Sequence, residues 1–141
     1  MRWHRRARHD RQRGAAAVEF ALVVVPFITL VFGAIDFGWA IDQDVLVNNA
    51  AREGAREGSL NPDPADVEAV VRSSLSSVAG GATVSVSCRR PAGDPCSLTG
   101  AVPGDTVVVT VSVDHDWITP LGDVFSPGGI TLTKTAEMRI E

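Results

Sequence analysis

The chain has 141 residues, of which 45% are hydrophobic and 6% aromatic, and a formal net charge of −4. This length gives room for one modest domain and an appendage, and the composition is too apolar for a disordered chain. The charge is unevenly distributed: residues 1–13 hold six arginines and one aspartate, whereas the rest hold seven basic and sixteen acidic side chains. A basic end on an acidic body requires a local explanation.

An apolar run follows the basic segment, and between Ala15 and Ile35 only Glu19 and Thr29 are polar. A helix of that length covers about 30 Å, the thickness of a hydrocarbon core, so a transmembrane helix is predicted over residues 15–35. Flanking arginines stay inside, so residues 1–14 are predicted to be a basic cytoplasmic leader. The same rule places the following residues outside the cytoplasmic membrane, as in a single-pass protein.

Two alternatives explain the amino end differently. Arginine clusters also neutralise nucleic-acid phosphates, but no binding motif or aromatic platform accompanies this one, so no nucleic-acid partner is expected. A cleaved secretory signal is the second alternative, with small residues at 38–40 as a cleavage site. The apolar run is longer than the roughly 7–15 residues of a signal's central region, which favours the membrane anchor.

Glu19 is the exception within the apolar run. An ionised side chain at a bilayer centre costs about 2.5–3.5 kcal/mol, and such residues are usually functional and paired. One interpretation is that Glu19, about one turn into the helix, reaches back to the interface. The other is that it pairs with a neighbouring chain: cleavage between Gly14 and Ala15 would create an α-amino group, largely protonated at neutral pH. Such a buried pair specifies register more than it adds stability.

Two stretches carry a family resemblance: RGAAAVEFALVVVPFITLVFGAIDFG and then NNAAREGAREGS. Together they resemble the TadE-like family, minor pilins or pseudopilins of the tight-adherence (Tad) pilus assembly system with a type IV pilin-like amino terminus. The resemblance covers about residues 13–59. It implies that a prepilin peptidase cuts between Gly14 and Ala15, and that Glu19 and Phe20 carry the signature that guides subunit assembly. It also implies other pilin-like subunits and the Tad machinery as partners.

The helix is predicted to extend beyond the membrane over residues 36–59, because residues recur there at helical spacing. The recurring positions are Ile41, Val45, Leu46 and Asn49. A narrow face of small residues follows at i, i+3, i+4 and i+7: Ala51, Gly54, Ala55 and Gly58. Since glycine costs a helix about 1 kcal/mol relative to alanine, this face is predicted to pack closely against a partner. The partner is either the protein's own head or another subunit.

Residues 60–141 are predicted to form an extracytoplasmic head. Asp63 is placed to cap a second helix, Pro64 suits its first position, and Gly80 ends it. The helix carries an apolar stripe made of Val67, Val70, Val71, Leu75 and Val78.

Three runs with period-two alternation follow, at 83–88, 106–114 and 130–141, and such runs predict half-buried strands. In the second run Val107, Val109, Val111 and Val113 share one face. In the third, Ile130, Leu132, Ala136, Met138 and Ile140 share one face, which Lys134 interrupts. The predicted fold is α+β: a long N-terminal transmembrane helix extends into a small head, where a second helix packs on a three- to four-stranded antiparallel sheet.

Cys88 and Cys96 are the only cysteines. Outside the cytoplasm a disulfide is permitted, and the turn-rich RRPAGDP between them favours closure. Two free thiols are the alternative. Metal ligation is disfavoured because no further cysteine or compact histidine set completes a site.

Catalytic motifs are missing from the sequence, so no enzyme, cofactor, metal or small-molecule substrate is expected. The one compact polar set, DHDW from Asp114 to Trp117, is predicted to be a solvated strand end with scattered side chains. The apolar segment WITPLGDVFSPGG either closes the core or forms a docking surface. The favoured function is pilus assembly; the alternative is a membrane-tethered envelope binding module that joins no filament.

Overall fold

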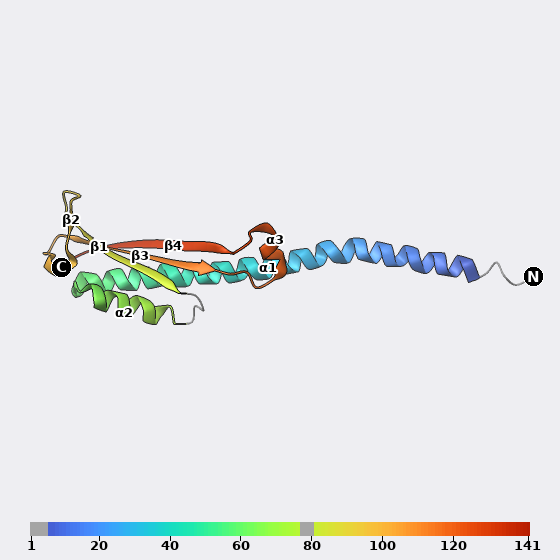
Figure 1. Ribbon diagram of the computed structural model, residues 1–141, viewed down its shortest axis with the longest axis horizontal. Helices are drawn as coiled ribbons and strands as arrows, with labels where there is room; N and C mark the ends of the chain where they lie inside the picture. The colour runs from blue at the N-terminus through green and yellow to red at the C-terminus, as the bar shows by residue number, and fades with distance from the viewer. Residues whose placement is uncertain (1–5, 77–80) are drawn as a thin grey trace, which may run out of the picture.

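The computed structural model describes residues 6–76 and 81–141. One helix, α1 (Arg6–Leu60), runs along most of the molecule, and all other elements lie beside its carboxy-terminal half (Figure 1). Its 55 residues extend over about 80 Å at about 1.5 Å per residue. Pro26 lies inside α1 without ending it. The predicted leader 1–14 is described only from Arg6, where α1 already begins, so Arg2, His4 and Arg5 lie outside the described residues.

The second helix, α2 (Pro64–Ser74), begins as the sequence predicts. The carboxylate of Asp63 accepts a hydrogen bond from the backbone N–H of Ala65 at 2.8 Å, and proline occupies the first turn. The helix ends earlier than predicted, with Leu75 as its C-cap. Ser73 and Ser74 both donate their hydroxyls to the carbonyl oxygen of Val70, and such local bonds compete with helix continuation. The predicted end around Val78 and Gly80 lies outside the described residues.

Four antiparallel strands form one sheet in the order β2-β1-β3-β4. They are β1 (Ala82–Arg89), β2 (Pro95–Cys96), β3 (Thr106–His115) and β4 (Ile130–Arg139). A single 3-10 turn, η1 (Leu98–Gly100), precedes β3, and the short helix α3 (Pro120–Phe125) connects β3 to β4. The predicted α+β fold with an antiparallel sheet is thus confirmed.

The sheet has a buried face and a solvated one, as alternation requires. On β3 the four alternate valines from Val107 to Val113 are buried. On the opposite face the hydroxyls of Thr110 and Thr135 lie 3.0 Å apart across β3 and β4. Lys134, which interrupts the apolar face of edge strand β4, forms an ion pair with Asp44 of α1, with 2.8 Å between Nζ and Oδ1.

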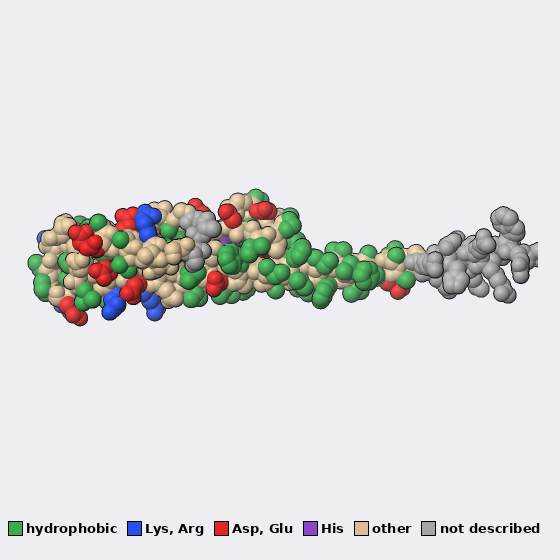
Figure 2. Space-filling model, turned by 90° about the horizontal axis from the view of Figure 1, so that it is seen from below, with side chains coloured by type: hydrophobic (Ala, Val, Ile, Leu, Met, Phe, Trp, Pro, Cys, Tyr) green, Lys and Arg blue, Asp and Glu red, His purple; other side chains and the backbone are tan. Residues whose placement is uncertain are grey.

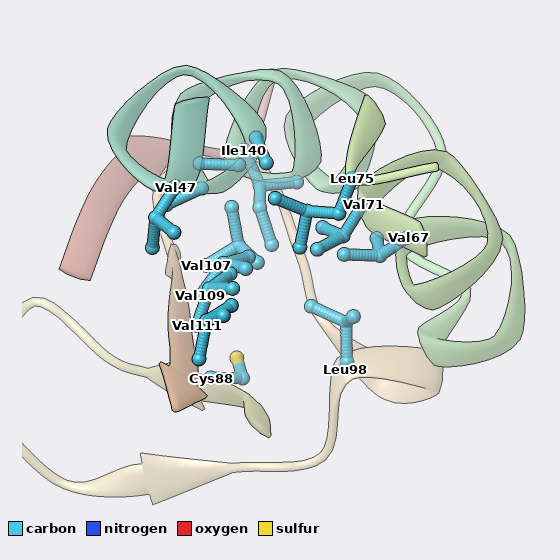
Figure 3. Packing of buried hydrophobic residues seen from close by; sticks show 14 residues of the cluster. Val47, Val67, Val71, Leu75, Cys88, Leu98, Val107, Val109, Val111 and Ile140 are labelled. Atoms are coloured by element: carbon cyan, nitrogen blue, oxygen red, sulfur yellow. The ribbon is translucent and has the colours of Figure 1, made fainter. Parts of the chain in front are cut away.

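The core lies where α1, α2 and the sheet meet (Figure 3). In this core α1 contributes mostly small side chains, whereas α2 and β3 contribute valines. Its buried members are Val47, Ala50, Ala51, Ala55, Val67, Val71, Leu75, Cys88, Leu98, Val107, Val109, Val111, Val113 and Ile140. The sheet therefore packs close to the backbone of α1.

The recurring positions that predicted the helical extension do not all lie on the face of α1 that enters the core. Ile41 and Val45 are about half exposed, and Asn49 is exposed as well. The buried face instead passes through Gln43, Val47 and the small residues. The spacing was correctly read as helical, but a smooth helix surface of alanines and glycines accommodates the sheet more closely than isoleucine would.

Candidate functional site

The amino-terminal half of α1 carries the residues predicted for processing and assembly. Gly14, Ala15, Glu19 and Phe20 are all exposed, and none of the described side chains lies within 4 Å of a Cβ built on Gly14. Glu19 follows Ala15 by four residues, so the two lie about one helical turn apart on the same face. The structure thus leaves the Gly14–Ala15 bond and Glu19 open to other molecules.

Exposed apolar side chains continue along this half of α1. Among the described helices, α1 is the one long and apolar enough to cross a membrane. Figure 2 shows them as a nearly continuous hydrophobic surface on the part of the helix that the head leaves bare. The large exposed members are Val18, Phe20, Leu22, Val23, Val25, Phe27, Ile28, Leu30, Val31, Ile35, Phe37, Trp39, Ile41 and Val45. Inside this segment, Thr29 donates its hydroxyl to the carbonyl oxygen of Val25 at 2.9 Å.

The small residues of the carboxy-terminal half face the protein's own head. A Cβ built on Gly58 would lie 2.9 Å from Cγ2 of Val107, closer than real side chains come, and one on Gly54 would collide with Val71. Ala51 and Ala55 are fully buried beside them. Of the two partners considered from the sequence, the structure brings the head to this face.

Asp36, near the middle of α1, binds the segment that precedes α3. This role is not visible in the sequence. Its carboxylate is buried and accepts hydrogen bonds from the backbone N–H groups of Ile118 (3.1 Å) and Thr119 (2.9 Å) and from the Thr119 hydroxyl. The Thr119 hydroxyl, followed by the backbone donors, lowers the pKa of Asp36 below its ordinary value against the opposing effect of burial. This Asp36 contact attaches the start of α3 to α1.

His115 corrects the interpretation of DHDW as a solvated strand end. Asp114 and Asp116 are exposed, but His115 is only 1% exposed and points inward. Its Nδ1 lies 2.7 Å from Oε1 of Gln43 on α1, and its ring meets Trp117 edge-on. The last residue of β3 faces inward by strand alternation, and α1 supplies a polar partner for Nδ1, whereas the buried Nε2 has no hydrogen-bond partner among the described residues.

The segment from 117 to 129 does not join the main core. Ile118 is 57% exposed and Val124 is 73% exposed, whereas the indole Nε1 of Trp117 donates to the carbonyl oxygen of Ser126 at 2.9 Å. Between α3 and α1 lies a groove of about 190 Å³. Its lining is Thr29, Gly33, Asp36, Phe37, Trp117, Leu121 and Gly122.

Cys88 and Cys96 are joined by a disulfide, with their Cα atoms 4.9 Å apart. The turn between them is closed by a hydrogen bond from Arg90 N–H to the carbonyl oxygen of Asp94 at 2.8 Å. The carboxylate of Asp105 lies close to both sulfur atoms. Sulfurs bonded to each other carry no thiolate for a metal, so this group is a structural crosslink.

Comparison with protein families adds one finding. The model of a family described as TadE-like protein matches residues 14–56, all of which lie in α1. The TadE-like resemblance seen in the sequence is thus confirmed over this segment. No curated protein and no solved structure matches the chain.

Proposed function

We propose that this chain, whose residues 14–56 match the TadE-like family, is a minor pilin or pseudopilin that acts in assembly of a Tad-type pilus. In this proposal α1 anchors it in the cytoplasmic membrane by a single pass. The basic amino end is cytoplasmic and the head lies outside, as the positive-inside rule predicts. The bare half of α1 packs against other pilin-like subunits.

The length of the exposed apolar surface carries this proposal. From Val18 to Val45 it covers about 42 Å of helix, whereas a hydrocarbon core is about 30 Å thick. Beyond Ile35, Phe37, Ile41 and Val45 at i, i+4 and i+8 form a ridge that stays about half exposed or more, although Phe37 also lines the groove beside α3. A simple tether needs no apolar surface past the bilayer, whereas helices that pack side by side do. This observation favours a packing subunit over a tethered binding module.

Glu19 supplies the register in this proposal. Cleavage after Gly14 by the prepilin peptidase leaves the α-amino group of Ala15 one turn from Glu19, and both positions are exposed. The amine of one subunit pairs with Glu19 of the next, so that both charges are compensated within the bilayer. Phe20 adjoins this pair on the exposed surface.

Replacing Glu19 tests the pairing. In a strain lacking the chromosomal gene, Glu19→Ala is expected to insert into the membrane normally yet fail to restore surface pili, because the Ala15 amine has no partner. Asp42→Ala is the matched control, since Asp42 is also exposed on α1 but lies outside the predicted span. The readouts are membrane fractionation and electron microscopy of pili. Normal piliation with Glu19→Ala would contradict the pairing mechanism.

Mass spectrometry of the membrane-bound chain tests processing independently. With the prepilin peptidase present, the expected amino terminus is Ala15. A chain that always retains residues 1–14 would contradict the cleaved-pilin role, and normal pili in the same cells would then indicate an uncleaved assembly factor.

The ridge tests whether the chain packs against subunits at all. Ile41→Asp is expected to reduce piliation without unfolding the head, because Ile41 is half exposed and outside the core. Asn49→Asp adds the same charge at an exposed polar position about two turns farther along the helix, beyond the apolar ridge, and is the control. Equal piliation by both variants would favour the tethered module.

A further inference from the structure

We propose that the α3 segment (residues 117–126) lies in the outer face of the bilayer and that the groove between α3 and α1 holds part of a phospholipid acyl chain. This inference rests on the membrane anchoring by α1 proposed above. It adds a second membrane contact, made by the head and separate from the spanning helix.

The first argument is the depth of the groove. Two of its lining residues, Thr29 and Gly33, belong to the predicted span. Thr29 precedes the end of the span at Ile35 by six residues, which is about 9 Å along the helix. Elements that lie in a membrane interface bury their apolar face by about 5–10 Å. The groove therefore lies at the depth where acyl chains begin.

The second argument is the chemistry of the exposed side chains. Ile118 and Val124 project from the α3 segment with most of their surface free, and neither belongs to the core. Leu121 and Trp117 line the groove from the α3 side. Hydrophobic side chains continue from the bare helix onto the adjoining end of the head (Figure 2). The exposed apolar side chains of the span thus have counterparts on the α3 segment.

Several polar groups of this segment are satisfied internally, as contact with lipid requires. Asp36 accepts the N–H groups of Ile118 and Thr119, which precede α3 and have no helical partner. The Trp117 indole donates to the carbonyl oxygen of Ser126, and the Ser126 hydroxyl donates to the carbonyl oxygen of Gly129 at 3.0 Å. These groups therefore need no water partner.

Charge sets how deep the segment lies and which lipid suits it. Asp116, just before the segment, and Asp123, inside α3, are both exposed, and none of the groove's lining residues is basic. Carboxylates stay at the water side of the interface, which keeps the segment from sinking into the hydrocarbon core. A site without cations offers nothing to an anionic headgroup, so the occupant is the apolar chain of the lipid.

A photocrosslinking residue distinguishes lipid from protein at this surface. The full-length chain carries p-benzoylphenylalanine in place of Val124, of Val102 or of Leu30, and is reconstituted in phosphatidylcholine vesicles and irradiated. Val102, an exposed valine at 58%, is the matched control because it lies in the turn before β3, beyond the far end of the sheet from α3. Leu30, exposed at 74% within the predicted span, reports on anchoring itself.

The expected result is that mass spectrometry detects a lipid adduct at positions 30 and 124 and none at position 102. An adduct at 30 without one at 124 would overturn the inference while leaving the membrane anchor intact. A crosslinked second chain at 124, in place of lipid, would also overturn it and would assign the surface to a protein partner. No lipid adduct at position 30 would contradict the anchoring on which the proposed function depends.

Discussion

The two halves of α1 use opposite kinds of side chain. The amino-terminal half exposes large apolar residues such as Phe20, Leu30 and Phe37, whereas the carboxy-terminal half buries alanine and glycine. In an amphipathic helix of a soluble protein, apolar residues face the core and polar ones the solvent. The small residues let the head come close to the backbone of α1. The large apolar side chains of the bare half face the surroundings of the protein.

This contrast separates stability from assembly along one helix. Side chains in the carboxy-terminal half hold the head in place and are expected to govern its unfolding. Most large apolar side chains in the bare half stay exposed, although Thr29, Gly33 and Phe37 meet the α3 segment at the groove, and they are expected to govern association. The following predictions test that division, beginning with the largest effect on stability.

Gly54→Val is expected to destabilise the head by about 3 kcal/mol, since overpacking a filled site forces backbone shifts. Even a Cβ at Gly54 meets Val71 and lies 3.3 Å from Cγ1 of Val109. Thermal unfolding of the full chain in detergent micelles measures the loss. Gly38→Val is the matched control in the bare half, where nothing lies within 4 Å, and it should leave the melting temperature almost unchanged. Equal losses at both positions would contradict the division.

Removing the disulfide with Cys88→Ser and Cys96→Ser is expected to cost about 2.5 kcal/mol, because the crosslink closes a short loop in the unfolded chain. The bare half should keep its helical content, which far-UV circular dichroism reports. Reductant should lower the melting temperature of the unmodified chain but leave the double variant unaffected. A reductant effect on both would assign the change to something other than this bond.

The Asp36 contact is expected to make stability depend on pH. The folded pKa of Asp36 is lowered, so its contribution is fully present above the unfolded pKa, about 3.9. The contribution is lost as the pH falls through the lower folded pKa. Asp36→Asn should therefore melt below the unmodified chain at pH 7, and the difference should close in acid. Asp42→Asn, at an exposed aspartate of α1, is the control, and an equal gap in that variant would contradict the assignment to Asp36.

Lys134→Met should have the smallest effect, below about 1 kcal/mol, because the pair with Asp44 is partly exposed and screened by salt. The difference from the unmodified chain should shrink further in high salt. Glu137→Gln, which removes a partly exposed pair with Arg89 inside the sheet, is the comparison. If Lys134→Met lost much more stability than Glu137→Gln, the ion pair between Lys134 and Asp44 would be shown to help hold the head on α1.

Local patterns predicted the elements well because their causes are local. Alternating valines of β3 and the cap at Asp63 each act within a few residues, and both are present in the structure. The Gly54 and Gly58 face could be recognised as a packing surface, but its partner could not. Which of α1's faces meets the sheet depends on residues far away in the chain.

Long-range polar contacts escaped prediction for the same reason. Asp36 and Thr119 are 83 residues apart, and Gln43 and His115 are 72 residues apart. In the sequence, Asp36 looks like the polar end of an apolar run and His115 like part of an acidic strand end. Only the antiparallel return of β3 alongside α1 brings each to its partner.

The unbroken course of α1 has a mechanical consequence. The helix is continuous from Arg6 to Leu60 and has no hinge at the boundary of the predicted span. A force along the helix axis that acts on the span would therefore displace the head instead of bending the helix. Lifting the span by one helical turn would raise the whole head by about 5.4 Å. The α3 segment is bonded to α1 through Asp36 and would move with the helix. Extraction of the span from the bilayer would therefore displace α1 and the head together as one rigid unit.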